Sequence, residues 1–378
     1  LKLIPQINTI KALLLFTADL FEGFMVHNLD QFAFASDNYS GIHPDILQAI
    51  TNANGGHQKA YGNDIYTQKL GELIKELFGQ NASCYPVFNG TGANITALTA
   101  LSPRFGAIIC TQTAHIHNDE INAPEYIGNF KILAIATSDG KLTPDLIQKE
   151  LYRLGNEHAA QPAVIYLSLV SELGTCYSLD EIRAIVALAK QYKLLVYIDG
   201  ARLANACAYL DCSLKDIADT GVDILSLGGT KNGLMIGEYI IVLNQKFDSD
   251  MKYLRKMTTQ LGSKMRFISA QFITWLSSGL WLKLAAHSNQ MANYFAQGLR
   301  TLANTIITQP VQSNAVFIIL PKSIKSALQE KYHFYDWNTN TNEVRLMTSF
   351  DTTKNQIDEF LDTARALLNN VSATKNQL

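Results

Sequence analysis

Residues 179–202 read LDEIRAIVALAKQYKLLVYIDGAR and predict a helix followed directly by a strand. Apolar side chains recur at spacings of three and four from Ile182 to Leu188, and Asp180 stands in the first turn, where a helix favours a negative charge. The next run, Leu194 to Ile198, is apolar throughout, as is Ala163 to Leu169 before the helix. Strands of this kind on either side of a helix are typical of a parallel sheet buried on both faces.

The same alternation of helical and apolar segments runs from about Thr67 to Leu243. It predicts an α/β doubly wound layer, in which helices cover both faces of a mostly parallel sheet. The other candidate strands of this layer are Tyr85 to Phe88, Ala107 to Cys110, Lys131 to Ile135, Asp223 to Leu227 and Glu238 to Leu243.

The pattern changes after about Phe247. A long helical stretch runs through Leu299, and two short strands, Asn314 to Leu320 and Val344 to Phe350, precede a terminal helix from Asn355 to Leu368. This order predicts a smaller α+β domain behind a long connecting helix. We therefore expect an N-terminal extension (1–30), a large α/β domain (31–260), and a connecting helix with a small C-terminal α+β domain (261–378).

Composition excludes several classes of function. The 378 residues carry 31 Lys and Arg against 33 Asp and Glu, so there is no basic surplus to neutralise a nucleic-acid backbone. The apolar stretch Ala12 to Val26 contains Asp19 and Glu22, which argues against a membrane span or a secretory signal. We expect free thiols in a reducing, cytoplasmic compartment and no metal site, because no CxxC spacing occurs among Cys84, Cys110, Cys176, Cys207 and Cys212.

Lys231 stands directly after a predicted strand, in a segment whose glycines allow a ligand to approach the backbone closely. A phosphate-binding P-loop needs GxxxxGK followed by Ser or Thr, whereas Lys231 follows Thr230 and precedes Asn232. Two interpretations stay open. Lys231 is either a solvated loop lysine or an amine of lowered pKa that forms a Schiff base with an aldehyde such as pyridoxal phosphate.

Asp199 follows the apolar strand that ends at Ile198. A carboxylate in such a position is costly unless it is paired. A protonated pyridine nitrogen is a suitable partner, because the protonated ring of pyridoxal phosphate serves as an electron sink. The alternative is that Asp199 caps the next helix or pairs with Arg202.

Two further segments follow predicted strands. Residues 88–94 read FNGTGAN, a Gly-rich turn at a helix start, where free N–H groups and the Thr91 hydroxyl favour an anion such as phosphate. The turn lacks the GxGxxG pattern of a dinucleotide-binding fold. His115 follows the strand that ends at Cys110 and either stacks on an aromatic ring and exchanges a proton near neutral pH, or is a structural histidine.

In this order, the four segments resemble the fold-type-I pyridoxal-phosphate enzymes, and within them the family of threonine aldolases and aromatic amino-acid β-eliminating lyases. The resemblance extends from about Phe32 to the C-terminus. Its most specific motifs are YIDGAR at 197–202 and LSLGGTKNG at 225–233. Supporting matches are Ser36-Asp37-Asn38, Tyr61-Gly62-Asn63-Asp64, Asn89-Gly90-Thr91, His115 with Glu120, and Val344-Arg345-Leu346.

The resemblance implies a fold-type-I architecture and a role for each matched residue. Lys231 would form the Schiff base with pyridoxal phosphate, Asp199 would pair with the ring nitrogen, and His115 would stack over the ring. The remaining roles are contacts to the phosphate from Gly90, Thr91 and Ser226, a place beside the cofactor for Arg202, binding of the substrate carboxylate by Ser36 and Arg345, and entry into the site from a neighbouring subunit by Tyr61.

The reaction implied is the retro-aldol cleavage of a β-hydroxy-α-amino acid, with L-threonine or allo-threonine giving glycine and acetaldehyde. β-Elimination with the same cofactor is the enzymatic alternative, and a non-catalytic binding protein on the same fold is the alternative from another class. The resemblance also implies a homodimer or homotetramer, with Tyr61 and Lys264 at the subunit boundary. The chain departs from the family pattern at Ser171–Thr175, where many members have an Asn and paired glycines, and this departure bears on the substrate.

Overall fold

A computed structural model describes residues 27–375, and Phe34–Leu378 forms one compact unit. Most of the predicted extension (1–30), including Ala12 to Val26, lies outside the described residues. The division into domains at residues 31 and 261 stays a prediction.

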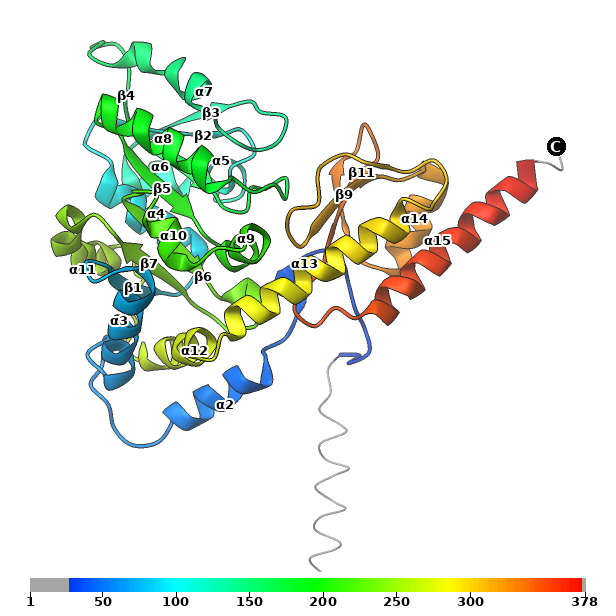
Figure 1. Cartoon of the computed structure of the whole chain (residues 1–378), viewed down its shortest axis with the longest axis horizontal. Helices are drawn as coiled ribbons and strands as arrows, with labels where there is room; N and C mark the ends of the chain where they lie inside the picture. Colours follow the sequence, from blue (N-terminus) through cyan, green and yellow to red (C-terminus); the bar gives the residue numbers. More distant parts are fainter. Residues whose placement is uncertain (1–26, 376–378) are drawn as a thin grey trace, which may run out of the picture. The chain divides into compact units, whose positions relative to one another are not determined.

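The compact unit is built on a seven-stranded sheet of the predicted, mostly parallel kind (Figure 1). Its strands are β1 (Ser83–Val87), β2 (Gly106–Thr111), β3 (Lys131–Ile135), β4 (Gln161–Ser168), β5 (Leu195–Asp199), β6 (Ile224–Gly228) and β7 (Glu238–Val242). Their order in the sheet is β1-β7-β6-β5-β4-β2-β3, and β7 is antiparallel to both of its neighbours. The expected fold class is therefore confirmed.

Helices cover both faces of this sheet. Ser178 and Glu181 form a reciprocal capping box at the start of the helix predicted over residues 179–191, and Lys193 ends that helix in a left-handed conformation. The helices up to the last strand of the sheet are α2 (Pro44–Ala53), α3 (Ile65–Phe78), α4 (Gly90–Leu101), α5 (His115–Asn118), α6 (Ala123–Gly128), α7 (Pro144–Gln148), α8 (Leu179–Tyr192), α9 (Leu203–Leu210) and α10 (Leu214–Ala218).

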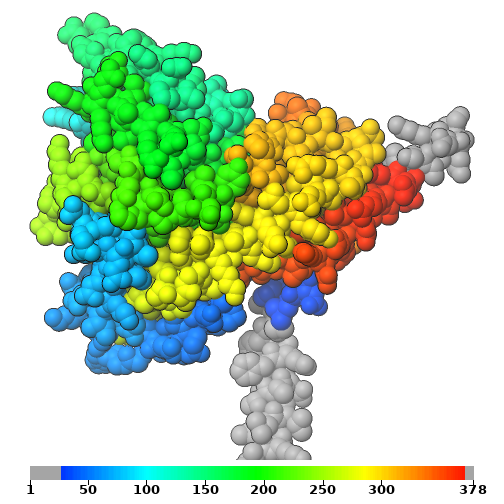
Figure 2. All heavy atoms as spheres, in the orientation of Figure 1, coloured from blue at the N-terminus to red at the C-terminus, as the bar shows by residue number. Residues whose placement is uncertain are grey.

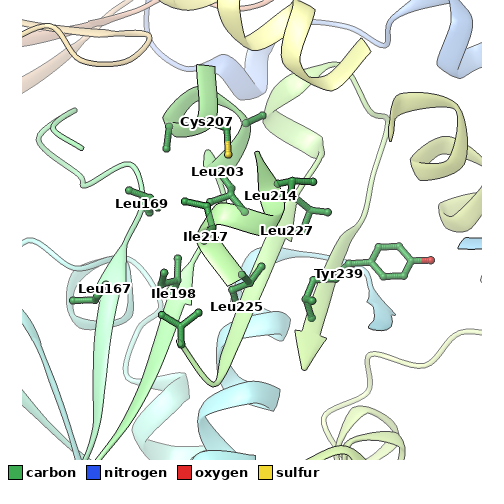
Figure 3. Packing of buried hydrophobic residues seen from close by; sticks show 14 of the residues in the cluster. Leu167, Leu169, Ile198, Leu203, Cys207, Leu214, Ile217, Leu225, Leu227 and Tyr239 are labelled. Carbon is green, nitrogen blue, oxygen red and sulfur yellow. The ribbon is translucent and has the colours of Figure 1, made fainter. Parts of the chain in front are cut away.

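Successive residues of the central strands enter two different hydrophobic cores, one on each face of the sheet. Tyr197 of β5 packs in the core beside α4, whereas its neighbour Ile198 packs with α8, α9 and α10. Figure 3 shows Ile198 and Leu225 beneath Leu203, Leu214 and the nearby sulfur of Cys207. Because both faces are buried, polar side chains can gather only where the strands end.

The single long connecting helix expected after Phe247 is wrong. The structure divides it into α11 (Asp248–Met257), α12 (Arg266–Ser277) and α13 (Leu280–Leu299). Gly279 adopts a φ of 69° between the last two helices, and the backbone after α11 leaves the helix at Thr259, whose φ is 63°. The long α13 continues from the large sheet to the C-terminal residues (Figures 1 and 2).

The C-terminal part contains a second sheet, of order β10-β11-β9-β8, in which every pair is antiparallel. The predicted strands and terminal helix correspond to β9 (Ala315–Ile319), β11 (Glu343–Met347) and α15 (Lys354–Lys375). The sequence analysis missed β8 (Ile306–Ile307), β10 (Tyr335–Asn338) and α14 (Lys322–Lys331).

Two observations concern the chain as a whole. None of the helices within residues 27–375 has the length and apolar character needed to cross a membrane. The five cysteines are unpaired, as expected of free thiols.

Candidate active site

The four predicted segments meet where the parallel strands of the large sheet end. Asp199 is the last residue of β5, and its register partner Ser168 ends β4. Lys231 lies in a 3-10 turn, η3 (Thr230–Asn232), shortly after β6 ends at Gly228. Helices α4 and α5 begin after β1 and β2. The carboxyl ends of parallel strands lie together at one end of the sheet, which is where such sheets bind ligands.

Asp199 accepts three hydrogen bonds. Its Oδ2 accepts from Tyr166 Oη at 2.6 Å and from Asn94 Nδ2 at 3.0 Å, and its Oδ1 accepts from the Ala201 N–H at 2.9 Å. Burial raises the pKa of this carboxyl, but the three donors and the charge of Lys231 outweigh burial and hold the pKa below its ordinary value. Asp199 is thus a buried carboxylate that stays ionised, a suitable partner for a cationic ligand.

His115 is connected to Asp199 through buried polar groups. Asn94 Nδ2 also donates to Glu120 Oε1 at 2.8 Å, and the same oxygen lies 2.7 Å from His115 Nδ1. The hydrogen bond to Glu120 raises the pKa of His115 although burial opposes it. With the Nδ1 proton directed at Glu120, Nε2 is the ring nitrogen that can exchange a proton.

Lys231 is a half-buried amine surrounded by charged groups. Burial and the nearby cation of Arg202 lower the pKa of Lys231, while the carboxylates of Asp37, Asp199 and Glu238 oppose that shift. A lowered pKa leaves a larger share of the amine neutral, and the neutral amine is the nucleophile. The interpretation of Lys231 as a solvated loop lysine does not fit these surroundings.

Arg202 pairs with a carboxylate from far away in the sequence. Asp37, in the 3-10 turn η1 (Asp37–Tyr39), accepts from Arg202 Nε at 2.7 Å and from Nη2 at 2.8 Å. Asn314 Nδ2 donates to the same carboxylate at 3.0 Å. Burial raises the pKa of Asp37, but the charge and hydrogen bonds of Arg202 hold it below its ordinary value. The local pair between Asp199 and Arg202, one of the alternatives considered, is therefore replaced by a bidentate pair with Asp37.

Arg345, on β11, forms no salt bridge with the residues that the structure describes, although the charges of Asp37 and Asp119 act on it. Its Nη2 donates to Ala35 O at 3.4 Å, and its buried Nε has no hydrogen-bond partner among residues 27–375. Burial and the charge of Arg202 lower the pKa of Arg345. The Trp337 ring centroid lies 5.7 Å from its guanidinium carbon. Such a guanidinium, close to a second cation, is suited to bind a carboxylate.

The Gly-rich turn after β1 starts α4. Asn89 Oδ1 accepts from the Gly92 N–H at 2.7 Å, and Gly90 and Thr91 form the first helical turn. A Cβ on Gly92 would overlap the Gln260 side chain, which the Phe88 N–H holds in place, so glycine suits this close approach. The N–H groups and the positive end of the helix dipole therefore lie at this turn, whereas binding of an anion there stays a prediction.

Two predicted residues use their hydroxyl groups locally. Ser226, buried within β6, accepts from the Gly200 N–H at 2.9 Å and so connects β6 to the loop after β5. Ser36 accepts from the Asn38 N–H at 3.2 Å, at the start of η1. Both lie next to residues of the site, and neither placement tests the predicted contact with a ligand.

Tyr61 is not joined to this group. It is exposed, its N–H donates to Ser263 O at 3.0 Å, and Lys256 Nζ lies 5.4 Å from its ring centroid. No hydrogen bond between described residues connects it to Lys231. The adjacent residues form a groove of about 300 Å³ that includes Lys264 and has a basic lining.

Cavity volume does not locate the site. A cavity of about 660 Å³ lies at the amino ends of β2, β3 and β4, where Gly106, Lys131 and Gln161 contribute to its lining. Asp199 and Lys231 lie at the opposite, carboxyl ends of the strands. None of the predicted site residues lines this cavity.

Sequence reasoning gave no role to four polar residues that the structure places here: Asn94, Tyr166, Glu172 and Glu238. One signal was available for Glu238, because an acidic residue that opens an otherwise apolar strand needs a partner. The first residue of antiparallel β7 lies beside the last residue of β6, which is how Glu238 reaches the site.

Comparison with known proteins agrees with this geometry. A family model described as β-eliminating lyase matches residues 33–322. Two curated proteins, each named low specificity L-threonine aldolase, are similar over 338 residues: one from a Pseudomonas species at 37% identity and one from Pseudomonas aeruginosa at 38%. Each match covers 89% of this chain and 97% of the relative.

Solved structures give the same result. A threonine aldolase from Leishmania major superposes with a TM-score of 0.85 at 31% identity, covering 89% of this chain and 99% of the other. A serine palmitoyltransferase from Sphingomonas wittichii, at 14% identity and a TM-score of 0.68, shares the fold. From the family match and these relatives together, the chain belongs to the β-eliminating lyase family.

Proposed function

We propose that this chain is a pyridoxal-phosphate-dependent aldolase that cleaves a β-hydroxy-α-amino acid, with L-threonine or allo-threonine giving glycine and acetaldehyde. The observation that carries the proposal is a lysine of lowered pKa and a buried, ionised aspartate at the ends of adjacent strands, β6 and β5. The relatives named L-threonine aldolase, at 37% and 38% identity, support the reaction.

The residues present fit pyridoxal phosphate. Asp199 offers a buried carboxylate to a protonated ring nitrogen, and the amine of Lys231 would hold the aldehyde carbon. His115 would stack over the ring, and Arg202, held by Asp37, would lie beside the cofactor. The phosphate would be surrounded by Gly90, Thr91 and Ser226.

The protein's part in the reaction is to orient the substrate. Arg345 would bind the substrate carboxylate through charge-assisted hydrogen bonds, and the Ser36 hydroxyl would assist. Anchoring the carboxylate selects which bond to Cα is aligned for cleavage. When bound, the cofactor supplies the electron sink for the electrons of the broken Cα–Cβ bond.

His115 would accept the proton of the β-hydroxyl group at Nε2, directly or through a water molecule. Its Nδ1 is oriented by Glu120, and the raised pKa strengthens it as a base. The proton can return from the same nitrogen to the carbon that becomes the glycine product.

The direct test is to add L-threonine to the purified, cofactor-loaded protein and to measure acetaldehyde and glycine. Lys231→Ala should lose nearly all turnover, together with the visible absorbance of the lysine-bound cofactor, because no other amine takes its place. Lys215→Ala is the matched control, since Lys215 pairs with Asp219 on the surface. Normal turnover in Lys231→Ala would remove Lys231 from this role.

β-Elimination is the second candidate, because the family model carries that activity in its description. Elimination would release a 2-oxo acid and ammonia, whereas aldol cleavage releases glycine and an aldehyde, so product analysis separates the two. A non-catalytic binding protein would bind the cofactor or an amino acid without forming either set of products.

We further propose that the enzyme acts in the cytoplasm as a homodimer or homotetramer. Exposed Tyr61 and the neighbouring groove with Lys264 supply a surface that a second copy could cover. Light scattering of the purified protein gives the number of subunits, and a monomer that turns over L-threonine at the full rate would contradict this assembly.

A further inference from the structure

Glu172 belongs to the segment in which this chain departs from the family pattern, and the proposed function assigns it no role. It follows β4 and reaches the site from that side. Its Oε1 accepts two hydrogen bonds, from the His115 N–H at 2.9 Å and from Ser168 Oγ at 2.6 Å. Its Oε2 is buried and has no hydrogen-bond partner in the part of the chain that the structure describes.

The bond to His115 differs from the other contacts of that residue. Glu120 holds the imidazole ring through Nδ1, whereas Glu172 holds the backbone N–H at the start of the four-residue helix α5. The residue before His115, Ala114, provides no side-chain cap for α5. Glu172 therefore supplies the capping bond of this short helix from the turn that follows β4.

The surroundings of Glu172 place its ionisation near neutral pH. Burial raises the pKa of Glu172 to about 7, although the hydrogen bonds from Ser168 and His115 favour the ionised form and act against that shift. The carboxylate of Asp199 adds to the increase. The other charged or titratable groups that interact with Glu172 are Arg202, Cys110, Tyr166 and Tyr177.

We propose that Glu172 is a positioning residue whose carboxylate fixes the backbone of His115, so that loss of its charge loosens the placement of the imidazole. A hydrogen bond to an ionised carboxylate is roughly twice as strong as one to a neutral acceptor. Protonation at Oε2 leaves Oε1 as a neutral acceptor, which is also what a glutamine offers. The consequence for turnover rests on the proposed function, whereas the consequence for the His115 backbone does not.

The His115 amide gives a readout that needs neither cofactor nor activity. In the cofactor-free protein, the chemical shift of this N–H should titrate with Glu172, moving downfield as pH rises through about 7. Titration of the His115 ring adds its own contribution to this amide, so the test is the difference between variants. Glu172→Gln should remove the contribution of Glu172. Glu120→Gln, which changes the partner of the ring and not of the amide, should retain it. An amide whose pH profile is the same in the wild type and in Glu172→Gln would overturn the proposal.

Ser168→Ala provides a second test that leaves Glu172 in place. It removes one of the two donors to Oε1, and a lost donor to the charged form raises the pKa of a carboxyl. The inflection of the His115 amide should therefore move to higher pH by about one unit. An inflection that stays in place or moves to lower pH would contradict the shared-oxygen geometry.

The catalytic readout compares variants across pH. The ratio of wild-type kcat to that of Glu172→Gln should be about 10 near pH 8 and approach 1 near pH 6, because the wild type then also carries a neutral group. A ratio that does not change with pH would contradict the positioning role.

Glu125→Gln is the matched control for these measurements. Glu125 also accepts a hydrogen bond from a backbone N–H, that of Ile132, at 2.9 Å. It lines the cavity at the amino ends of β2, β3 and β4, away from the site. Its pH profile should match the wild type. If the His115 amide does not respond to Glu172, the role of Glu172 is refuted, whereas product analysis could still support an aldolase. If the amide responds but no glycine and aldehyde are formed, only the proposed reaction is refuted.

Discussion

Asp199 and Arg345 carry opposite charges within one site, and their surroundings differ in how completely they satisfy those charges. Asp199 accepts hydrogen bonds from three donors: Tyr166 on β4, Asn94 on α4 and the Ala201 N–H after β5. The Nε of Arg345 is buried and has no hydrogen-bond partner within residues 27–375, and the charge of Arg202 lowers the pKa of this guanidinium. Buried polar groups without partners cost free energy. The folded chain therefore supplies Asp199 with partners of its own, whereas it leaves part of the Arg345 side chain without one.

The largest effect should come from removing the carboxylate of Asp199. Asp199→Ala should lower kcat about 1000-fold or more, because the group opposite the predicted ring nitrogen is lost. It should also lower the free energy of unfolding by about 3 kcal/mol, since three buried donors lose their acceptor. A coupled acetaldehyde assay measures the first effect, and denaturant unfolding of the cofactor-free protein measures the second.

Asp248→Ala is the control for the loss of a partly buried hydrogen bond away from the site. Asp248 accepts from Tyr85 Oη at 2.7 Å. This variant should retain kcat while losing some stability. Full turnover by Asp199→Ala would contradict the assigned partner of the ring nitrogen.

Arg345→Met should have the opposite profile. The KM for the amino acid should rise about 100-fold with a smaller change in kcat, because charge-assisted hydrogen bonds to the substrate carboxylate are lost. The melting temperature without amino acid should not fall, since methionine keeps the packing of the side chain and removes a buried, unmatched charge. A marked loss of stability without any change in KM would show that Arg345 is structural.

Glu238 extends the comparison to a third buried charge. Its Oε2 also lacks a partner among the described residues, and burial, opposed by the charge of Lys231, raises the pKa of Glu238 to about 8. The folded state favours the neutral form. The stability that Glu238 contributes is therefore full below its unfolded pKa of 4.5 and is lost as pH rises through about 8.

Glu238→Gln removes that loss. A pKa that differs between 4.5 and about 8 corresponds to about 5 kcal/mol, so the free energy of unfolding of the variant, relative to the wild type, should increase by about that amount between acidic pH and pH values above the pKa of Glu238. Urea unfolding at both ends of this range measures the difference. If the free energies of unfolding of the wild type and of Glu238→Gln change with pH in the same way, the pKa of Glu238 is not raised by folding.

The sequence predicted the large sheet better than the small one, for a physical reason. The strand predicted at Lys131 to Ile135 has those bounds in the structure, and the other strands of the layer differ by two residues or fewer at each end. The central strands β4 to β7 are apolar because they are almost wholly buried, and the strand at the β3 edge has one buried residue. In contrast, β10 reads YDWN, is largely exposed, and has an irregular register with β11. Its pairing comes from tertiary contact, which no local pattern reveals.

The site divides in the same way. Lys231, Asp199, Thr91 and His115 stand beside strand ends and were recognisable from local sequence. The partners that complete them were not, because Asp37 and Arg202 are 165 positions apart and Asn94 reaches Asp199 across 105 positions. Side chains that meet only after folding leave no spacing signal in the chain.

The smallest predicted effect comes from removing one of the hydrogen bonds that Asp199 accepts. Tyr166→Phe removes one of the three donors and leaves Asp199, Asn94 and the fold of β4 in place. The pKa of Asp199 should rise, since a donor to the charged form is lost, and kcat should fall about 5-fold, with a larger loss at acidic pH. Tyr197→Phe is the matched control, because its hydroxyl reaches Asp199 only through Asn94. If the two variants have the same kcat and the same pH profile, the Tyr166 hydrogen bond is not what keeps Asp199 ionised, and the two remaining donors with the charge of Lys231 must account for it.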